Sequence, residues 1–178
     1  MQTLSEVSIV GEKVILRRFA ASDIADNYLE WLNDPILMRF SNQRFLRHDR
    51  QSSLRYLQSF DDSPNFFLCV LDQAGHRMIG TMTAYLAQQH GTADIGIMIG
   101  DKTAKGSGYG FDAWRTLMSW LLDMQGIRKV TAGTLACNAQ MLKLIQGSGM
   151  QADGTRRHQE IIDGMPQDIA YFARFRDV

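Results

Sequence analysis

The sequence predicts an α/β protein built on a mixed, mostly antiparallel sheet, and three observations support this fold class. Short apolar runs of strand-like length recur between turn signals. A long amphipathic helix pattern lies between two such runs, residues 93–99 and 129–135, which is typical of a βαβ unit. The pair Asp163-Gly164 separates two further strand-like segments and favours a β-hairpin.

The predicted domain organisation is simple. A chain of 178 residues is long enough for one domain with a sizeable core. Its hydrophobic content of 45% is ordinary for a globular protein. We therefore expect residues 1–178 to form a single domain, with about residues 1–11 as an N-terminal extension.

The first elements follow from local patterns. Residues Val14–Arg18 predict a short strand. Ser22 or Asp23 can cap a following helix, and the segment 33–35, which contains a proline, ends it. Residues 36–40 predict a second short helix. Another helix is expected through Leu54, Leu57 and Gln58.

Three strands are expected next, at Phe66–Leu71, Met78–Leu86 and Ala93–Ile99. The segment 73–76 is a turn signal between the first two of them, so the three should form an antiparallel meander.

The second half of the chain begins with a helix whose apolar residues share one stripe. The members of this stripe are Trp114, Leu117, Met118, Leu121 and Met124. Gly126 is expected to end the helix. A buried strand at 129–135, a short helix at 139–146 and hairpin strands at 156–162 and 168–175 complete the prediction.

Charge and cysteine content narrow the functional classes. The chain has 19 basic and 19 acidic residues, so no strong overall field would recruit nucleic acid or a membrane surface. Cys69 and Cys137 are isolated, the four histidines are scattered, and none matches a metal-ligand spacing. The residues near the N-terminus lack the apolar stretch of a signal peptide. We expect a cytoplasmic protein that binds no metal.

A glycine-rich segment, Gly106-Ser107-Gly108-Tyr109-Gly110, lies between the strand at 93–99 and the long helix. Such a turn directs backbone N–H groups toward a ligand at the positive end of a helix and is a seat for phosphate. A P-loop is excluded because no Gly-Lys pair occurs in the chain. A dinucleotide fingerprint fails as well, since Phe111 stands at its last position and residues 129–135 contain no acid.

Several segments around this loop resemble one family. Thr103–Gly108 resembles the pyrophosphate loop of the GNAT acetyltransferases, Gln/Arg-x-x-Gly-x-Gly/Ala, with Thr103 at the first position. Asn138-Ala139-Gln140-Met141, followed by Gly149-Met150, resembles the family's later helix. Val14–Arg18 with Asp23 resembles its first strand and helix.

The segment Trp31–Pro35 resembles the corresponding segment in one branch of this family. That branch contains the ribosomal-protein-alanine N-acetyltransferases, together with diamine and amino-sugar acetyltransferases. The likeness extends from about residue 14 to residue 175.

The resemblance implies the GNAT fold, in which two central strands splay apart and flanking helices cover the sheet. It implies acetyl-CoA as the co-substrate, with pantetheine paired to the backbone of Ile97, Met98 and Ile99. The pyrophosphate would be held by the loop residues Lys105, Gly106, Ser107, Gly108, Tyr109 and Gly110. Asn138 can cap the following helix, and in the family the matching residue also bonds pantetheine.

The chemistry implied is direct attack of a primary amine on the thioester, with backbone N–H near Ile99 polarising the carbonyl. The amine must first lose a proton, and Asp94 is the candidate general base, where several relatives carry Glu. Many relatives supply a proton to the leaving thiolate from Tyr, but the matching residue here is Ile145, and Met141 stands where others have Ser. Ser148, Tyr85 or water could serve instead.

The acceptor is expected to be a small-molecule amine or a peptide N-terminus. One basic and aromatic group consists of Arg39, Phe40, Arg44, Phe45, Arg47 and His48, and a second of Arg156, Arg157 and His158. Together they predict an anionic acceptor such as a nucleotide-linked amino sugar. Polyamines are less favoured because no acidic cluster accompanies these residues.

Two other functions stay open at this point. A non-catalytic acyl-CoA-binding module is possible because Ile145 replaces the acid, and a nucleotide-binding domain of another type would prefer ATP or NAD to coenzyme A. Relatives are often dimers, so a homodimer is possible.

Overall fold

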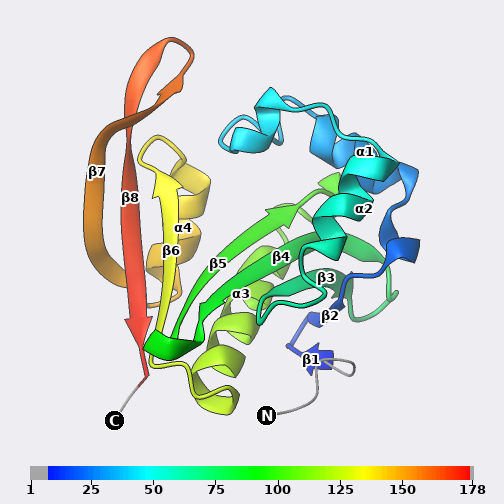
Figure 1. The fold of residues 1–178 in the computed structure, drawn as a ribbon, viewed down its shortest axis with the longest axis horizontal. Coiled ribbons are helices and arrows are strands. Elements are labelled where there is room, and N and C mark those ends of the chain that lie inside the picture. The colour runs from blue at the N-terminus through cyan, green and yellow to red at the C-terminus, as the bar shows by residue number, and fades with distance from the viewer. Residues whose placement is uncertain (1–7, 177–178) are drawn as a thin grey trace.

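The computed structural model describes residues 8–176, apart from the side chain of Met124. Its centre is one mixed sheet with the strand order β1-β2-β3-β4-β5-β6-β8-β7 (Figure 1). The strands are β1 (Ser8–Val10), β2 (Val14–Arg18), β3 (Phe66–Asp72), β4 (Met78–Ala87), β5 (Thr92–Ile99), β6 (Lys129–Leu135), β7 (Gln151–Ile162) and β8 (Met165–Phe175). The helices are α1 (Asp26–Asn33), α2 (Arg50–Gln58), α3 (Tyr109–Ser119), which continues as a π-helical turn (Trp120–Met124), and α4 (Ala139–Gly147).

The topology confirms the predicted meander, βαβ unit and hairpin. Strands β3, β4 and β5 pair antiparallel in sequence order, and β5 and β6 pair parallel on either side of the α3 crossover. The hairpin β7–β8 turns at Asp163 and Gly164, whose φ angles of 49° and 78° both lie in the left-handed region. That geometry is the one a two-residue hairpin turn requires.

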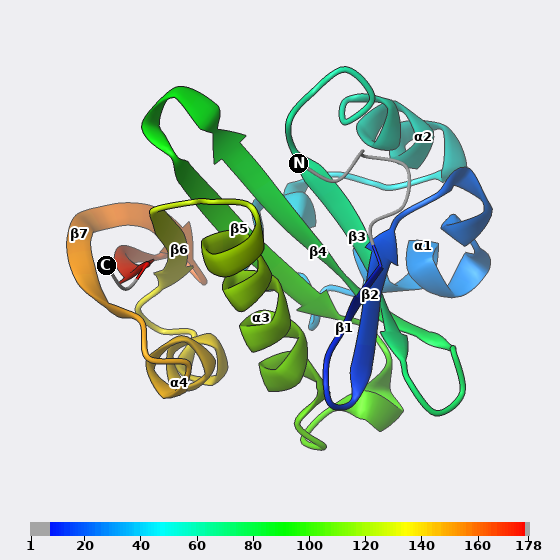
Figure 2. The same ribbon diagram turned by 90° about the horizontal axis from the view of Figure 1, so that it is seen from below.

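Helices cover both faces of the sheet, and each face has its own core (Figure 2). On one face α3 packs through Trp114 and Leu117, both fully buried, and α4 packs through Ile145. On the other face Tyr28 of α1 joins Phe67 of β3. The stripe predicted for the long helix is therefore core, with Met124 outside the described side chains.

The start of the first helix was predicted wrongly. The helix α1 begins at Asp26, after a short 3-10 turn at Ala21–Asp23. The carboxylate of Asp23 accepts two hydrogen bonds from Arg17, each 2.7 Å long, and one from the backbone N–H of Ala20. It therefore closes the 3-10 turn and secures the chain to β2, and it does not cap α1.

Two other segments also differ from prediction. Residues 36–40 form turns, because the Asp34 carboxylate accepts from the N–H groups of Ile36 and Leu37 and bends the chain away from a helix. Residues Ser8–Val10, predicted within an extension, pair with β2 as an edge strand.

The sheet opens in its middle. Strands β5 and β6 pair only over residues 92–94 and 129–131, although β5 continues to Ile99 and β6 to Leu135. Beyond this short ladder β6 stays paired with β8, and β5 stays paired with β4. The splay predicted for the central strands is present, and it leaves a gap in the sheet beside the second half of β5.

Candidate functional site

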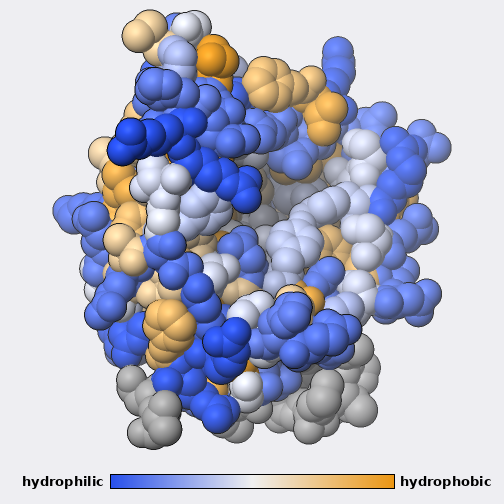
Figure 3. Space-filling view, turned by 60° about the vertical axis from the view of Figure 1, so that its left-hand side comes forward, coloured by the Kyte–Doolittle hydropathy of each residue, from blue (hydrophilic) through white to orange (hydrophobic). Residues whose placement is uncertain are grey.

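A cleft of about 1610 Å³ passes through the splay and joins two sides of the molecule. One end is lined by the glycine-rich loop and α4, and the other by α2 and the segment between α1 and α2. A hollow is visible near the centre of the face shown in Figure 3, which brings forward the left-hand side of Figure 1. The sheet itself contributes residues of β4 and β5 to the wall.

Backbone conformation shapes the glycine-rich loop. Gly106 and Gly108 have φ angles of 76° and 84°, a region that favours glycine. A Cβ atom added at Gly106 would meet nothing within 4 Å, and one at Gly108 would meet only Lys13. The loop thus presents uncovered backbone at the start of α3, which suits a phosphate ligand.

Lys13 is a residue of this loop region that the sequence did not reveal. Its Nζ donates to the carbonyl of Ser107 at 2.9 Å and lies 5.9 Å from the ring centroid of Tyr109. The turn that holds Lys13 is fixed by the Asp112 carboxylate, which accepts from three successive backbone N–H groups of residues 12–14. Only the fold brings these segments together, since about 95 residues separate them in the chain.

Most of the predicted cofactor residues line the cleft. Those that do are Ile97, Met98, Ile99, Lys105, Gly106, Gly108, Gly110 and Asn138, whereas the side chains of Ser107 and Tyr109 lie outside its lining. Asn138 Oδ1 accepts from the N–H of Met141 at 3.2 Å and so caps α4.

Asp94 lies next to the cleft but not in its lining. It stands where β5 and β6 still pair, opposite Thr131, whose hydroxyl donates to Asp94 Oδ2 at 2.7 Å. Although the residue as a whole is exposed, partial burial of the carboxylate among the strands raises the pKa of Asp94. The hydrogen bond from Thr131 lowers that pKa by less than burial raises it.

A pair of tyrosines connects this region to the cleft. Tyr85 is the cross-strand partner of Asp94, so the two side chains share a face of the sheet. The hydroxyl of Tyr85 shares a hydrogen bond of 2.8 Å with that of Tyr56, and Tyr56 lines the cleft. The sequence pointed to Tyr85 but not to Tyr56, because the pairing of α2 with β4 depends on tertiary structure.

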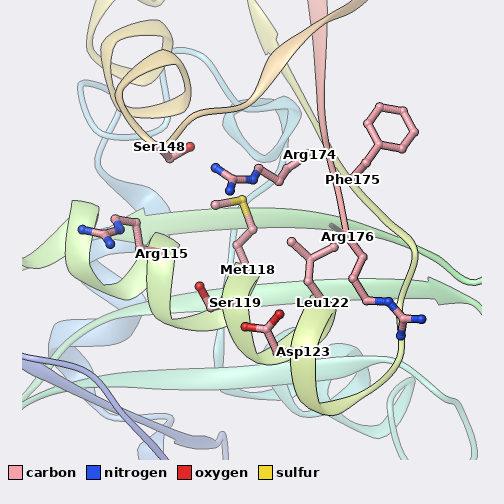
Figure 4. Close-up of a pocket in the computed structure, with 9 residues that line it drawn as sticks. All are labelled: Arg115, Met118, Ser119, Leu122, Asp123, Ser148, Arg174, Phe175 and Arg176. Carbon is pink, nitrogen blue, oxygen red and sulfur yellow. The ribbon is translucent and has the colours of Figure 1, made fainter. Parts of the chain in front are cut away.

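Ser148, the other side chain proposed as a proton donor, is less well placed than Tyr85, and Ile145 occupies the position of the family's donor without being able to donate. Ile145 is fully buried in the core, and the Ser148 hydroxyl is buried and donates to the Ile145 carbonyl at 2.6 Å. Ser148 lines a separate cavity of about 180 Å³ between α3 and β8 (Figure 4). In Figure 4 the guanidinium groups of Arg115 and Arg176 extend in opposite directions, so this smaller cavity does not gather its charges around one ligand.

The structure corrects the prediction that two basic groups line the acceptor end of the cleft. Arg39, Arg47 and His48 line the cleft, but Arg44 does not. The second group, Arg156, Arg157 and His158, lies on exposed β7 outside the cleft, with Arg156 over the ring of Tyr171. Strand β7 pairs with β8 at the edge of the sheet, and residues 156–158 contribute nothing to the cleft lining.

The segment between α1 and α2 contacts the tip of the β7–β8 hairpin. Arg39 pairs with Asp163 at 2.5 Å, Asn42 donates to Glu160 at 3.0 Å, and Arg44 donates to the carbonyl of Ile161 at 3.2 Å. Arg44 is therefore occupied by a structural contact. These three contacts join the segment before α2, part of which lines the cleft, to the tip of the hairpin.

Residues 13–151 match the family described as acetyltransferase (GNAT) domain. The chain belongs to the GNAT acetyltransferase family. It is an acetyl-CoA-dependent N-acetyltransferase by family, as its sequence motifs imply.

Three proteins illustrate the likeness. The N-acetyltransferase 9-like protein of Caenorhabditis briggsae is 21% identical over 155 residues, which cover 82% of this chain and 78% of that protein. The ribosomal L7/L12 α-N-protein acetyltransferase RimL, solved with coenzyme A in a disulfide with its own cysteine, has a TM-score of 0.83 at 17% identity, covering 96% and 99% of the chains.

A chimeric spermidine N-acetyltransferase, SpeG from Vibrio cholerae combined with hSSAT, has a TM-score of 0.81 at 16% identity, covering 93% and 96% of the chains. At these identities the two solved structures confirm the GNAT fold. Their names show that proteins with this fold act on ribosomal proteins and on spermidine.

The described cleft fits acetyl-CoA. The glycine-rich loop offers open backbone for the pyrophosphate, the splayed strands leave room for an extended arm, and Lys105 and Lys143 add positive charge at this end. In residues 8–176 no group of three or more His, Cys, Asp or Glu side chains could hold a metal ion. No helix in that range is long and apolar enough to cross a membrane.

Proposed function

We propose that the protein acetylates a primary amine of a small molecule, such as an amino sugar, by direct attack of the amine on acetyl-CoA. One observation supports this above all, namely that a single cleft connects the glycine-rich loop to an acceptor chamber under α2. The ion pair of Arg39 with Asp163 ties one wall of that chamber to the hairpin, and a wall fixed in this way would favour a small acceptor. Acetyl-CoA supplies the activated acetyl group, and the chain supplies orientation and proton transfer.

The proposed roles follow the geometry. Ile97, Met98 and Ile99 would bind the pantetheine arm along the open edge of β5, with Asn138 opposite them. The loop from Lys105 to Gly110 would hold the pyrophosphate through its backbone N–H groups.

Asp94 would take the proton of the amine as general base. Asp94 is three residues from Ile97, which corresponds to about 10 Å along an extended strand. A short carboxylate cannot span that distance, so water or the hydroxyls of Tyr85 and Tyr56 would relay the proton.

A peptide N-terminus is the second candidate acceptor, and the rim of the cleft favours it in one respect. Ile36 and Leu46 line the cleft and are 83% and 61% exposed, so an apolar peptide side chain could pack there. A non-catalytic acyl-CoA-binding module is the outcome that inactivity with every amine would support.

The experiment is a coenzyme A release assay with a panel of amino sugars, amino acids and peptides. We expect turnover with at least one small-molecule amine and a loss of about 100-fold or more in kcat/KM for Asp94→Asn. Turnover confined to peptides would favour the second candidate. Binding of acetyl-CoA without turnover of any amine would contradict the proposed activity.

The remaining parts of the proposal concern domain organisation, location and partners. We propose a single GNAT domain, because one sheet contains all the described strands. Both cysteines are free thiols, which suits a cytoplasmic location. A homodimer, and the lack of metal, nucleic-acid and membrane partners, stay predictions.

A further inference from the structure

The charged residues of the cleft all have the same sign. Although the chain as a whole has as many acids as bases, the cleft is lined by five cationic side chains and by no Asp or Glu among the described residues. The cations are Arg39, Arg47, Arg55, Lys105 and Lys143, and His48 accompanies them.

These cations fall into two groups at opposite ends of the cleft. Lys105 belongs to the glycine-rich loop and Lys143 to α4, where the phosphates of the co-substrate are proposed to bind. The three arginines come from α2 and from the segment before it, on the other face of the sheet. The phosphates therefore account for the first group only.

Arg47 and Arg55 are the arginines available to a ligand. Arg39 is paired with Asp163, whereas neither Arg47 nor Arg55 has an ion-pair or side-chain hydrogen-bond partner within residues 8–176. Asp49 lies close enough to Arg55 for their charges to interact, but its carboxylate caps α2 by accepting from the N–H of Ser52 at 2.7 Å. The cleft lining itself contains no acid that neutralises the two arginines, and Asp49, which lies outside that lining, offsets the charge of Arg55 only in part.

Apolar and aromatic residues make up much of the rest of the acceptor wall, and Ser41, Gln43, Ser52 and Ser53 add neutral polar groups. The apolar and aromatic residues include Leu37, Phe40, Leu46, Tyr56 and Phe67. Both arginines are exposed, and an acceptor that packs on the apolar wall would exclude water from them and strengthen their attraction for its anion. The same field repels a polycation.

We propose that the acceptor is an amine that also carries a carboxylate or phosphate group, which Arg47 and Arg55 bind while its body packs on the apolar wall. This inference rests on the proposed acetyl transfer and names the class of its acceptor. It assigns the anion to Arg47 and Arg55 and excludes polyamines. Guanidinium groups suit this task because they bind both anions in a bidentate fashion.

The test compares amines that differ in one anionic group. Phenylalanine is set against phenylalaninamide, and glucosamine 6-phosphate against glucosamine, with spermidine as the polycation. In wild-type protein we expect kcat/KM for the anionic member of at least one pair to exceed that of its neutral partner by about tenfold. The pair that shows the larger ratio distinguishes carboxylate from phosphate.

The variants Arg47→Gln and Arg55→Gln should bring this ratio down by about tenfold, mainly through KM, while acetyl-CoA affinity stays unchanged. Arg176→Gln removes the same charge from a surface position outside the cleft and should leave the ratio as it is. A wild-type ratio near one in both pairs, an equal effect of Arg176→Gln, or a preference for spermidine would overturn the inference.

A second measurement does not depend on turnover. Calorimetry measures the binding of acetylated products to protein saturated with coenzyme A. One pair is N-acetylphenylalanine and N-acetylphenylalaninamide, and the other is N-acetylglucosamine 6-phosphate and N-acetylglucosamine. Tighter binding of the anionic products, lost in the Arg47 and Arg55 variants, supports the inference even if no amine is turned over. Equal binding of charged and neutral products contradicts it, and tight acetyl-CoA binding in the same protein would leave the proposed co-substrate intact.

Discussion

Asp94 combines two properties that a general base requires. Its carboxylate has a raised pKa because it is partly buried, which makes it a stronger base than an ordinary aspartate. Thr131 orients it through a 2.7 Å hydrogen bond. Its distance from Ile97 along β5 is the reason that a relay is needed between Asp94 and the amine.

The pH dependence of the enzyme should report this carboxylate. Activity needs ionised Asp94, so kcat/KM should fall as the pH drops through its raised pKa, and Asp94→Asn should remove that limb. Because burial disfavours the charged form, native stability should decrease as the pH rises from the ordinary pKa of an aspartate through the raised one, and Asp94→Asn should abolish that decrease. Kinetics and thermal unfolding across pH measure both effects.

Asp62→Asn is the matched control, since Asp62 is exposed and away from the cleft. An acid limb that is the same in wild type and Asp94→Asn would show that another group, such as the amine itself, titrates there.

The two cysteines should differ sharply in reactivity. Cys137 is exposed and lines the cleft, whereas Cys69 is fully buried and burial raises the pKa of its thiol. We expect N-ethylmaleimide to label Cys137 first and acetyl-CoA to slow that labelling. Peptide mass spectrometry of wild type and Cys137→Ser measures it. Labelling of Cys137 at the same rate with saturating acetyl-CoA would contradict the position of the co-substrate in this cleft.

At the scale of elements, the open edge of β5 and the start of α4 stand on either side of the gap in the sheet. β5 loses β6 as a partner after residue 94, and α4 begins at the end of β6 with Asn138 as its N-cap. One side chain therefore connects helix stability with the cleft. A substitution that keeps the helix cap but not the amide group can therefore separate the two proposed roles of Asn138.

Asn138→Ala should lower the free energy of unfolding by about 1 kcal/mol, because the N–H of Met141 loses its side-chain acceptor. It should also weaken acetyl-CoA binding. Asn138→Ser can still cap the helix, so it should restore stability but not affinity. Denaturant unfolding and calorimetry measure the two quantities, and recovery of both by Ser would mean that Asn138 acts only as a cap.

At the scale of the whole molecule, most elements followed from local pattern. The meander, the βαβ crossover and the Asp163-Gly164 turn were predicted because apolar periodicity and turn chemistry are local signals. The start of α1 and the turns at 36–40 were not predicted. There the carboxylates of Asp23 and Asp34 accept hydrogen bonds from nearby backbone and side-chain donors.

The residues of the candidate site also fall into those that local motifs predict and those that only tertiary packing brings together. The glycine-rich loop and Asn138 could be found because they are contiguous motifs that resemble a known family. Arg47 was assigned to the acceptor from its local basic cluster, whereas Lys13, Tyr56 and Arg55 were not assigned, because their positions depend on long-range packing. Arg44 was assigned to the acceptor although its partner is a carbonyl on a distant hairpin.

Calorimetric titration of acetyl-CoA into wild type and Gly110→Val tests the central claim most directly. Gly110 lines the cleft without a positive φ, and a Cβ there would lie 3.3 Å from Ile99, so valine narrows the site with little backbone strain. Gly75→Val, in a turn away from the cleft, is the control. We predict binding in wild type and control and a loss of at least about tenfold in Gly110→Val. Equal affinity in all three, or no binding to folded wild-type protein, would contradict the account.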